Sequence, residues 1–112
     1  MTRWTTPTIT IKLPDTVDLM AANNVYVTIE QGNYKLLKTG DALTVSAHQV
    51  QLSLTQAETG RLQPTMPKDI TEYFKDMRPQ IQLNWTYSDG SRACTVIQPL
   101  AVGDNLENEV LE

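Results

Sequence analysis

The chain has 112 residues, of which 40% are hydrophobic and 20% charged, the composition of one ordinary globular domain and not of a disordered segment. Its net charge is −4, and the last nine residues hold four of the 13 acids and no base. The rest of the chain therefore has nine basic and nine acidic residues and no net charge. Because nucleic-acid binding needs clustered cations, this balance predicts that neither DNA nor RNA is a partner.

The chain has a single cysteine, Cys94, and a single histidine, His48. One cysteine cannot form an internal disulfide, which favours a reducing compartment. No apolar stretch has the length of a signal-peptide core or of a membrane span. We therefore expect a protein that is made in the cytosol, leaves it only by assembly or lysis, and has no membrane partner.

Apolar and polar residues alternate over four segments, residues 8–13, 25–30, 50–54 and 81–87. A period of two with polar partners is typical of half-buried antiparallel strands, and short strands with frequent turns are typical of sandwiches or small barrels. The prediction is an all-β protein: an immunoglobulin-like antiparallel β-sandwich of about seven strands with one or two short helices. Residues 1–103 form its single domain, and residues 104–112 form an acidic C-terminal segment.

Two hairpins are predicted from turn residues. A Gly32-Asn33 turn of type II′ pairs Gln31 with Tyr34, so that Ile29 lies opposite Leu36.

An Asp89-Gly90 turn of type I′ would pair Ser88 with Ser91 and place Cys94 opposite the buried Trp85. In this register Val96 lies opposite Leu83, and Arg92 lies over Tyr87 in a cation-π contact. A three-residue loop would instead bring Ala93 and Thr95 to the Trp85 face. We expect the two-residue loop, because it sets small apolar residues against large ones.

Two segments interrupt the strand pattern. Thr55 and Glu58 have the spacing of a capping box, which predicts a short helical turn that ends at Gly60. A second amphipathic helix is expected over residues 69–77, capped by Asp69. It either closes an end of the sandwich or presents aromatic residues to a partner, and the first is favoured because so short a helix needs packing to persist.

No group of residues indicates catalysis. His48 has no accompanying nucleophile and is expected to be a solvated turn residue. The glycines are too dispersed for a phosphate loop, and metal-ligand spacing is missing. We therefore expect no enzyme activity, no catalytic residue, no cofactor and no metal. Trp85 and Tyr87 would form a sugar-stacking platform only if their face were exposed.

Candidate contact residues lie outside the alternating segments, where exposed apolar side chains tend to mark partner surfaces. One is near the N-terminus, two lie in the 64–79 insert and three in the acidic segment: Trp4, Tyr73, Phe74, Leu106, Val110 and Leu111.

Three runs carry a family resemblance: VYVTIEQGNYKLLKTGDALTV, VQLSLTQAET and IQLNWTYSDGSRACTVIQPLAVGDNLENEV. Their order resembles small proteins encoded among the structural and tail genes of prophages in Gram-positive bacteria, although the QPTMPKDITEYFKDM insert is longer than that pattern. The resemblance implies a phage-derived structural or assembly protein in the cytoplasm of the bacterial host or in the virion. Its partners would be other phage structural proteins or further copies of itself. The alternative is a carbohydrate-binding or adhesin-like sandwich module, because one fold supports many functions.

Overall fold

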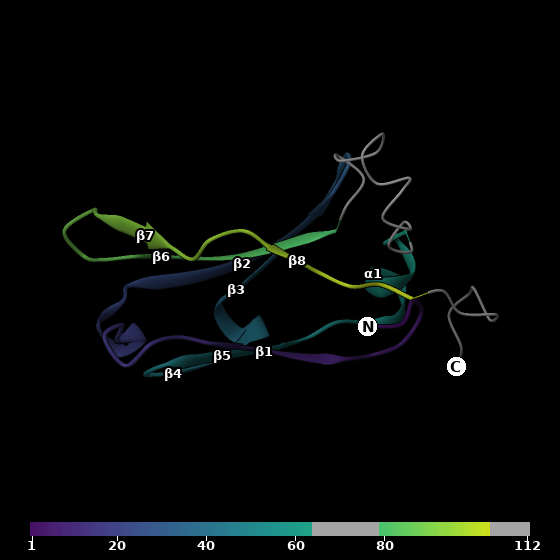
Figure 1. Ribbon diagram of the computed structural model, residues 1–112. Helices are drawn as coiled ribbons and strands as arrows, with labels where there is room; N and C mark the ends of the chain where they lie inside the picture. The colour runs from purple at the N-terminus through teal and green to yellow at the C-terminus, as the bar shows by residue number, and fades with distance from the viewer. Residues whose placement is uncertain (64–78, 104–112) are drawn as a thin grey trace.

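The computed structural model describes residues 1–63 and 79–103. Two antiparallel sheets pack face to face, with β6, β7 and β8 in one layer of Figure 1 and β1, β4 and β5 in the other. The all-β sandwich expected from the alternating segments is confirmed; its assignment to the immunoglobulin-like class stays a prediction.

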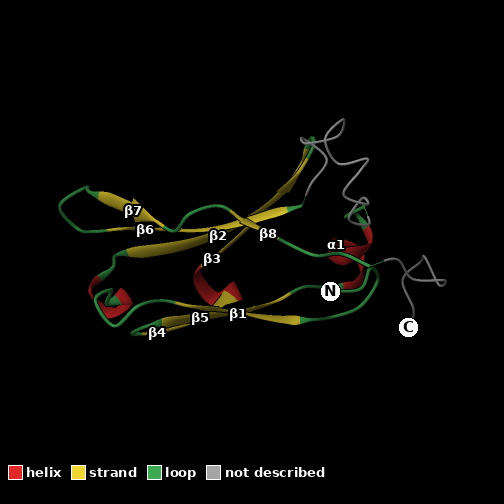
Figure 2. Cartoon of the chain, in the orientation of Figure 1, coloured by secondary structure: helices red, strands yellow, loops and turns green. Residues whose placement is uncertain are grey.

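The smaller sheet has three strands in the order β1-β5-β4: β1 (Thr8–Lys12), β5 (Gln49–Ser53) and β4 (Leu43–Ser46). The larger sheet has the order β3-β2-β6-β7, with β8 also paired to β6: β3 (Tyr34–Thr39), β2 (Asn24–Gln31), β6 (Gln80–Thr86), β7 (Arg92–Cys94) and β8 (Gln98–Pro99). Two short 3-10 helices, η1 (Leu19–Ala21) and η2 (Gly40–Ala42), lie in the connections between strands. Figure 2 draws these helices in red and the strands in yellow.

The core lies between the sheets, where the apolar residues of each alternating strand meet. Val27 and Ile29 of β2 and Leu83 of β6 are completely buried, and they face Val50 and Leu52 of the opposite sheet. Burying each such side chain contributes about 1.5–3 kcal/mol. The polar members of the same strands lie on the outer faces, so the alternation positions both the core and the surface.

The first hairpin has the predicted register. Gln31 pairs with Tyr34 and Ile29 with Leu36, across the turn at Gly32 and Asn33. Gly32 has φ +55°, the positive value that a type II′ turn requires at its first central residue.

The second hairpin differs from the prediction by one residue. Tyr87 N–H donates to the Ser91 carbonyl, Gly90 N–H donates to the Tyr87 carbonyl, and Trp85 pairs with Ala93. Gly90 takes φ +90° at the end of a three-residue loop, and the Asp89 carboxylate accepts hydrogen bonds from the backbone and hydroxyl of Ser91. The two-residue turn was therefore wrong, because this turn with a left-handed glycine satisfies more polar groups.

A β-bulge follows the second hairpin. Thr95 N–H donates to the Leu83 carbonyl, whereas Gln98 already pairs with Ile81. Val96 and Ile97 therefore both lie opposite the single residue Gln82. An extra residue of this kind bends the strand and turns its side chains out of the regular alternation.

The predicted helical turn is confirmed as α1 (Gln56–Gly60). Thr55 Oγ1 accepts from Glu58 N–H while the Glu58 carboxylate accepts from Thr55 N–H, which completes the capping box. The helix expected over residues 69–77 lies outside the described residues. The chain start packs beside α1. At the same end of the sandwich Gly103 N–H donates to the Met1 carbonyl, and the Met1 amino group donates to the Ala101 carbonyl.

Candidate functional site

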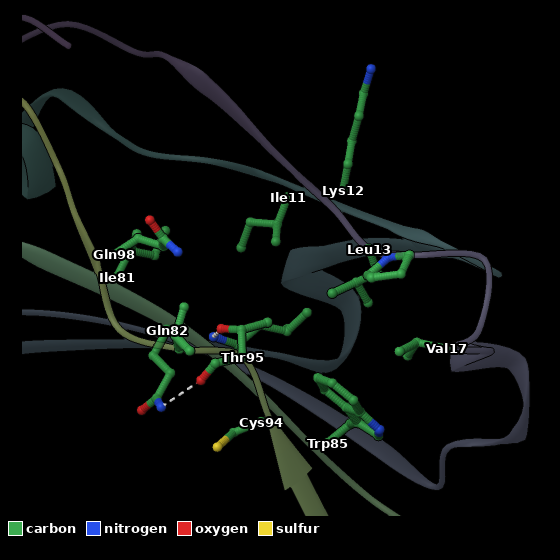
Figure 3. Close-up of a pocket in the computed structure, with 13 residues that line it drawn as sticks. Ile11, Lys12, Leu13, Val17, Ile81, Gln82, Trp85, Cys94, Thr95 and Gln98 are labelled. Carbon is green, nitrogen blue, oxygen red and sulfur yellow. Dashed lines mark hydrogen bonds between the residues drawn. The ribbon is translucent and has the colours of Figure 1, made fainter.

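One side of the sandwich is open between β1 and the strands β6 to β8, and an apolar cavity of about 510 Å³ lies there. Figure 3 shows its lining, with Ile11 and Leu13 on one wall and Ile81, Trp85 and Thr95 on the other. A cavity of this size with apolar walls falls within the range of sites that hold a ligand or a partner's side chains.

Trp85 forms part of the cavity wall from a buried position. Only 4% of its surface is exposed, and its Nε1 donates to the Tyr87 hydroxyl at 2.9 Å. The indole and the phenol therefore satisfy each other inside the protein, which is the usual condition for a buried tryptophan. The aromatic platform required for sugar stacking is not formed by this pair.

The bulge holds the chain beside the cavity and exposes two apolar side chains. Gln82 Nε2 donates to the Thr95 carbonyl at 2.9 Å, drawn as a dashed line in Figure 3, and Thr95 Oγ1 accepts from Leu83 N–H. These two hydrogen bonds fix Thr95. The next two residues are exposed, Val96 to 72% and Ile97 to 56%. Adjacent exposed β-branched residues beside an apolar cavity form the kind of surface that partners cover.

β1 completes the open side with a free backbone edge. Leu13 N–H donates to the His48 carbonyl, and Leu54 N–H donates to the Pro7 carbonyl, at the two ends of the β1–β5 pair. Because antiparallel bonding alternates, the odd residues of β1 bond to β5, and Thr8, Thr10 and Lys12 direct their N–H and C=O groups outward. Among the described residues, these groups have no hydrogen-bond partner.

We call these three features together the open side: the β1 edge, the cavity mouth, and the bulge residues Val96 and Ile97. The sequence already contained a signal for the bulge, because Val96 and Ile97 are consecutive apolar residues where alternation predicts one. The predicted position of Val96 opposite Leu83 on the buried face is therefore wrong, because the side chain is exposed.

A polar cluster lies on the outer face of the larger sheet. Arg92 donates from Nε and Nη2 to Asn84 Oδ1, at 3.1 and 2.9 Å. The guanidinium covers Asn84, which is only 7% exposed. Arg92 therefore does not make the predicted contact with Tyr87. Cys94 lies on this face and is exposed, so its predicted burial against Trp85 was wrong, as the one-residue shift requires.

His48 lies in the predicted turn between β4 and β5, but it is half-buried. Its Nδ1 donates to the Val17 carbonyl, which ties the turn to the loop after β1. The turn position is confirmed, but the histidine is only partly solvated, because its ring joins two loops.

An ion pair connects α1 to β3. Lys38 Nζ lies 2.8 Å from the Glu58 carboxylate, which also accepts from Thr55 N–H. Burial raises the pKa of Glu58, but the hydrogen bonds and charge of Lys38 and Thr55 outweigh it, so the pKa lies below its usual value. Burial raises the pKa of the nearby Tyr34, partly offset by the charge of Arg61.

Of the predicted contact residues, only Trp4 is among the described ones. It is half-buried with φ +61°, its ring lies against Gly60, and the Arg3 guanidinium is 5.9 Å from the ring centroid. The other candidates, Tyr73, Phe74, Leu106, Val110 and Leu111, lie outside the described residues. Their part in contacts stays a prediction.

Within residues 1–63 and 79–103, no three His, Cys, Asp or Glu side chains gather as metal ligands would. No helix in the same part of the chain is long and apolar enough to cross a membrane. No family model, curated protein or solved structure matches the chain.

Proposed function

We propose that this chain is a non-enzymatic structural or assembly protein that acts through protein–protein contacts made by its open side. The observation that carries the proposal is the exposure of Val96 and Ile97 beside an apolar cavity and a strand edge that is unpaired within residues 1–63 and 79–103. Soluble proteins usually protect such edges and rarely expose adjacent large apolar side chains without a partner.

The resemblance to small proteins of prophage structural and tail regions supports a more specific role. On this proposal the protein is phage-derived, its sandwich is of the immunoglobulin-like class, and it works in the cytoplasm of the bacterial host or in the virion. Virion parts act through repeated contacts between copies and neighbours, which strand edges and apolar patches provide. Neither nucleic acid nor membrane is among the proposed partners.

The carbohydrate-binding alternative receives no support from the site. Trp85 is buried and its Nε1 is bonded to the hydroxyl of the half-buried Tyr87, so the two rings do not form an exposed stacking platform for a sugar.

Incorporation into particles tests the proposal. Tagged protein would be produced in a bacterium that carries a prophage with this gene, the prophage induced, and the particles purified on a density gradient. We expect the wild type in the particle band and at least a tenfold loss for V96S/I97S, about 1.4 kcal/mol or more of binding free energy. The matched control is M20S/L37S, which removes two apolar side chains that are 62% and 52% exposed elsewhere.

The control should enter particles as the wild type does. Absence of the wild-type protein from the particles, or equal incorporation of V96S/I97S, would overturn the proposal.

A further inference from the structure

We infer that the β1 edge pairs with β1 of a second copy of this chain, in antiparallel orientation, around a twofold axis at Thr10. The inference rests on the proposed function and names one of its partners. Its starting point is the set of outward backbone groups at Thr8, Thr10 and Lys12, which have no partner among the described residues.

The spacing of these groups is self-complementary. With Thr10 opposite Thr10 of the second copy, Thr8 lies opposite Lys12 and Lys12 opposite Thr8. Each of these pairs is of the hydrogen-bonded kind, so every outward N–H and C=O of β1 finds a partner. A shift of register in either direction leaves some of them unpaired, and the shift that centres Lys12 brings two ammonium groups together.

The side chains agree with this register on both faces. On the face toward the cavity, Ile9 of one copy lies opposite Ile11 of the other. Ile11 lines the cavity, so the pairing places a second apolar side chain beside it. On the outer face, Thr10 meets Thr10, and Lys12 meets a threonine. An interface with the same patch on both copies is the commonest kind in oligomers.

The C-terminal end of β1 limits the pairing. Pro14 occupies the next outward position and has no N–H to donate, whereas Pro7 has the parity of the residues that bond to β5. Pro14 therefore stops the edge from extending past Lys12, which is one way in which edge strands are restricted to a defined contact.

The other edges fit this role less well. β4 has four residues and is contacted by η1, and β7 has three. Pairing of β3 with itself around Leu37 would set Leu36 against Lys38, whose ammonium is already paired with Glu58. β1 is therefore the edge whose bonding groups and side chains both match a second copy.

Cysteine cross-linking tests the register. In a C94S background, Thr10→Cys places two thiols in a pair whose Cα atoms are about 5.5 Å apart, within the roughly 4.4–6.8 Å range of disulfides. Thr8→Cys, on the same strand and face, lies opposite Lys12 and is the matched control. After mild oxidation with copper phenanthroline, we expect T10C to form disulfide dimer at least tenfold faster than T8C.

The double variant T8C/K12C should cross-link again, because the two thiols then face each other across the axis. Thr10→Pro, which removes one outward N–H without breaking a bond to β5, should sediment as a monomer at concentrations where the wild type is dimeric. A T10C rate no greater than that of T8C, or a monomeric wild type throughout, would overturn the inference. If the protein nevertheless entered particles, and did so only with Val96 and Ile97 intact, the proposed function would still hold. The contact would then be with a partner other than a second copy.

Discussion

The ring of Trp4 lies directly against Gly60, so closely that a Cβ on residue 60 would come within 2.4 Å of the ring carbons. This contact fixes the start of the chain on the end of α1, together with the hydrogen bond from Arg3 Nη2 to the Gly60 carbonyl and that from Thr59 Oγ1 to the Thr5 carbonyl. The glycine is required here by space, because its neighbour is a rigid ring that cannot give way easily.

Gly60→Ala is therefore expected to destabilise the protein by about 1–3 kcal/mol, the usual cost of overpacking. Urea denaturation followed by circular dichroism measures the change. In a W4A background the same substitution should cost little, and the resulting coupling should lie within the roughly 0.5–3 kcal/mol found for residues in contact. Equal costs of Gly60→Ala in both backgrounds would show that the ring does not occupy this position.

Tyr87→Phe is expected to cost about 1–3 kcal/mol, because it leaves the buried Trp85 indole N–H without its acceptor. The matched control is Tyr26→Phe on the outer face of β2, whose hydroxyl has no hydrogen bond among the described residues. Thermal unfolding of both variants and of the wild type makes the comparison. If Tyr87→Phe proved as stable as Tyr26→Phe, the hydrogen bond to the indole would not contribute.

The Lys38–Glu58 pair should make stability depend on pH in acid. The pKa of Glu58 is lowered in the folded protein, so its contribution is present above the unfolded value of about 4.3 and is lost as the pH falls through the lower folded value. Lys38→Met should therefore lose stability relative to the wild type at neutral pH, with the difference shrinking below about pH 4.

Lys35→Met, on the same strand, is the control for removal of a lysine, and we expect no such convergence with the wild type in acid. Urea midpoints measured between neutral pH and pH 3 give the comparison. A difference between Lys38→Met and the wild type that stayed constant over this range would contradict the assignment to Glu58.

Cys94 should react with a thiol reagent in the native protein about as fast as it does in the unfolded chain, because it is exposed on the outer face. Absorbance after addition of Ellman's reagent, with and without urea, measures both rates. Reaction limited by the rate of global unfolding would instead place the thiol against Trp85 and restore the two-residue turn at Asp89 and Gly90.

Local sequence rules predicted the parts of the fold that short-range chemistry decides. Alternation located β1, β2, β5 and β6, the Gly32 turn fixed the first hairpin, and Thr55 with Glu58 capped α1. In each case the local signals were compatible with only one structure; in the first hairpin, for example, turn geometry and apolar pairing agreed.

The sequence of the second hairpin is compatible with two registers, and side-chain packing alone favours the one that is not formed. The observed register is stabilised by the hydrogen bonds that Ser91 makes with Asp89 and Tyr87. The bulge then changes the register between β7 and β8 and brings Val96 and Ile97 to the surface. Bulges arise from the competition between two strand registers, which depends on tertiary contacts rather than on local pattern.

Amide hydrogen exchange along β1 tests most directly whether the open side is a contact surface. In the isolated chain, the amides of Thr8, Thr10 and Lys12 should exchange rapidly. Those of Ile9 and Ile11, bonded to β5, and of Leu13, bonded to the His48 carbonyl, should exchange slowly. As protein concentration rises into the dimeric range, we predict that protection spreads to Thr8, Thr10 and Lys12. Rapid exchange of these three amides at every concentration, and in assembled particles as well, would contradict the account.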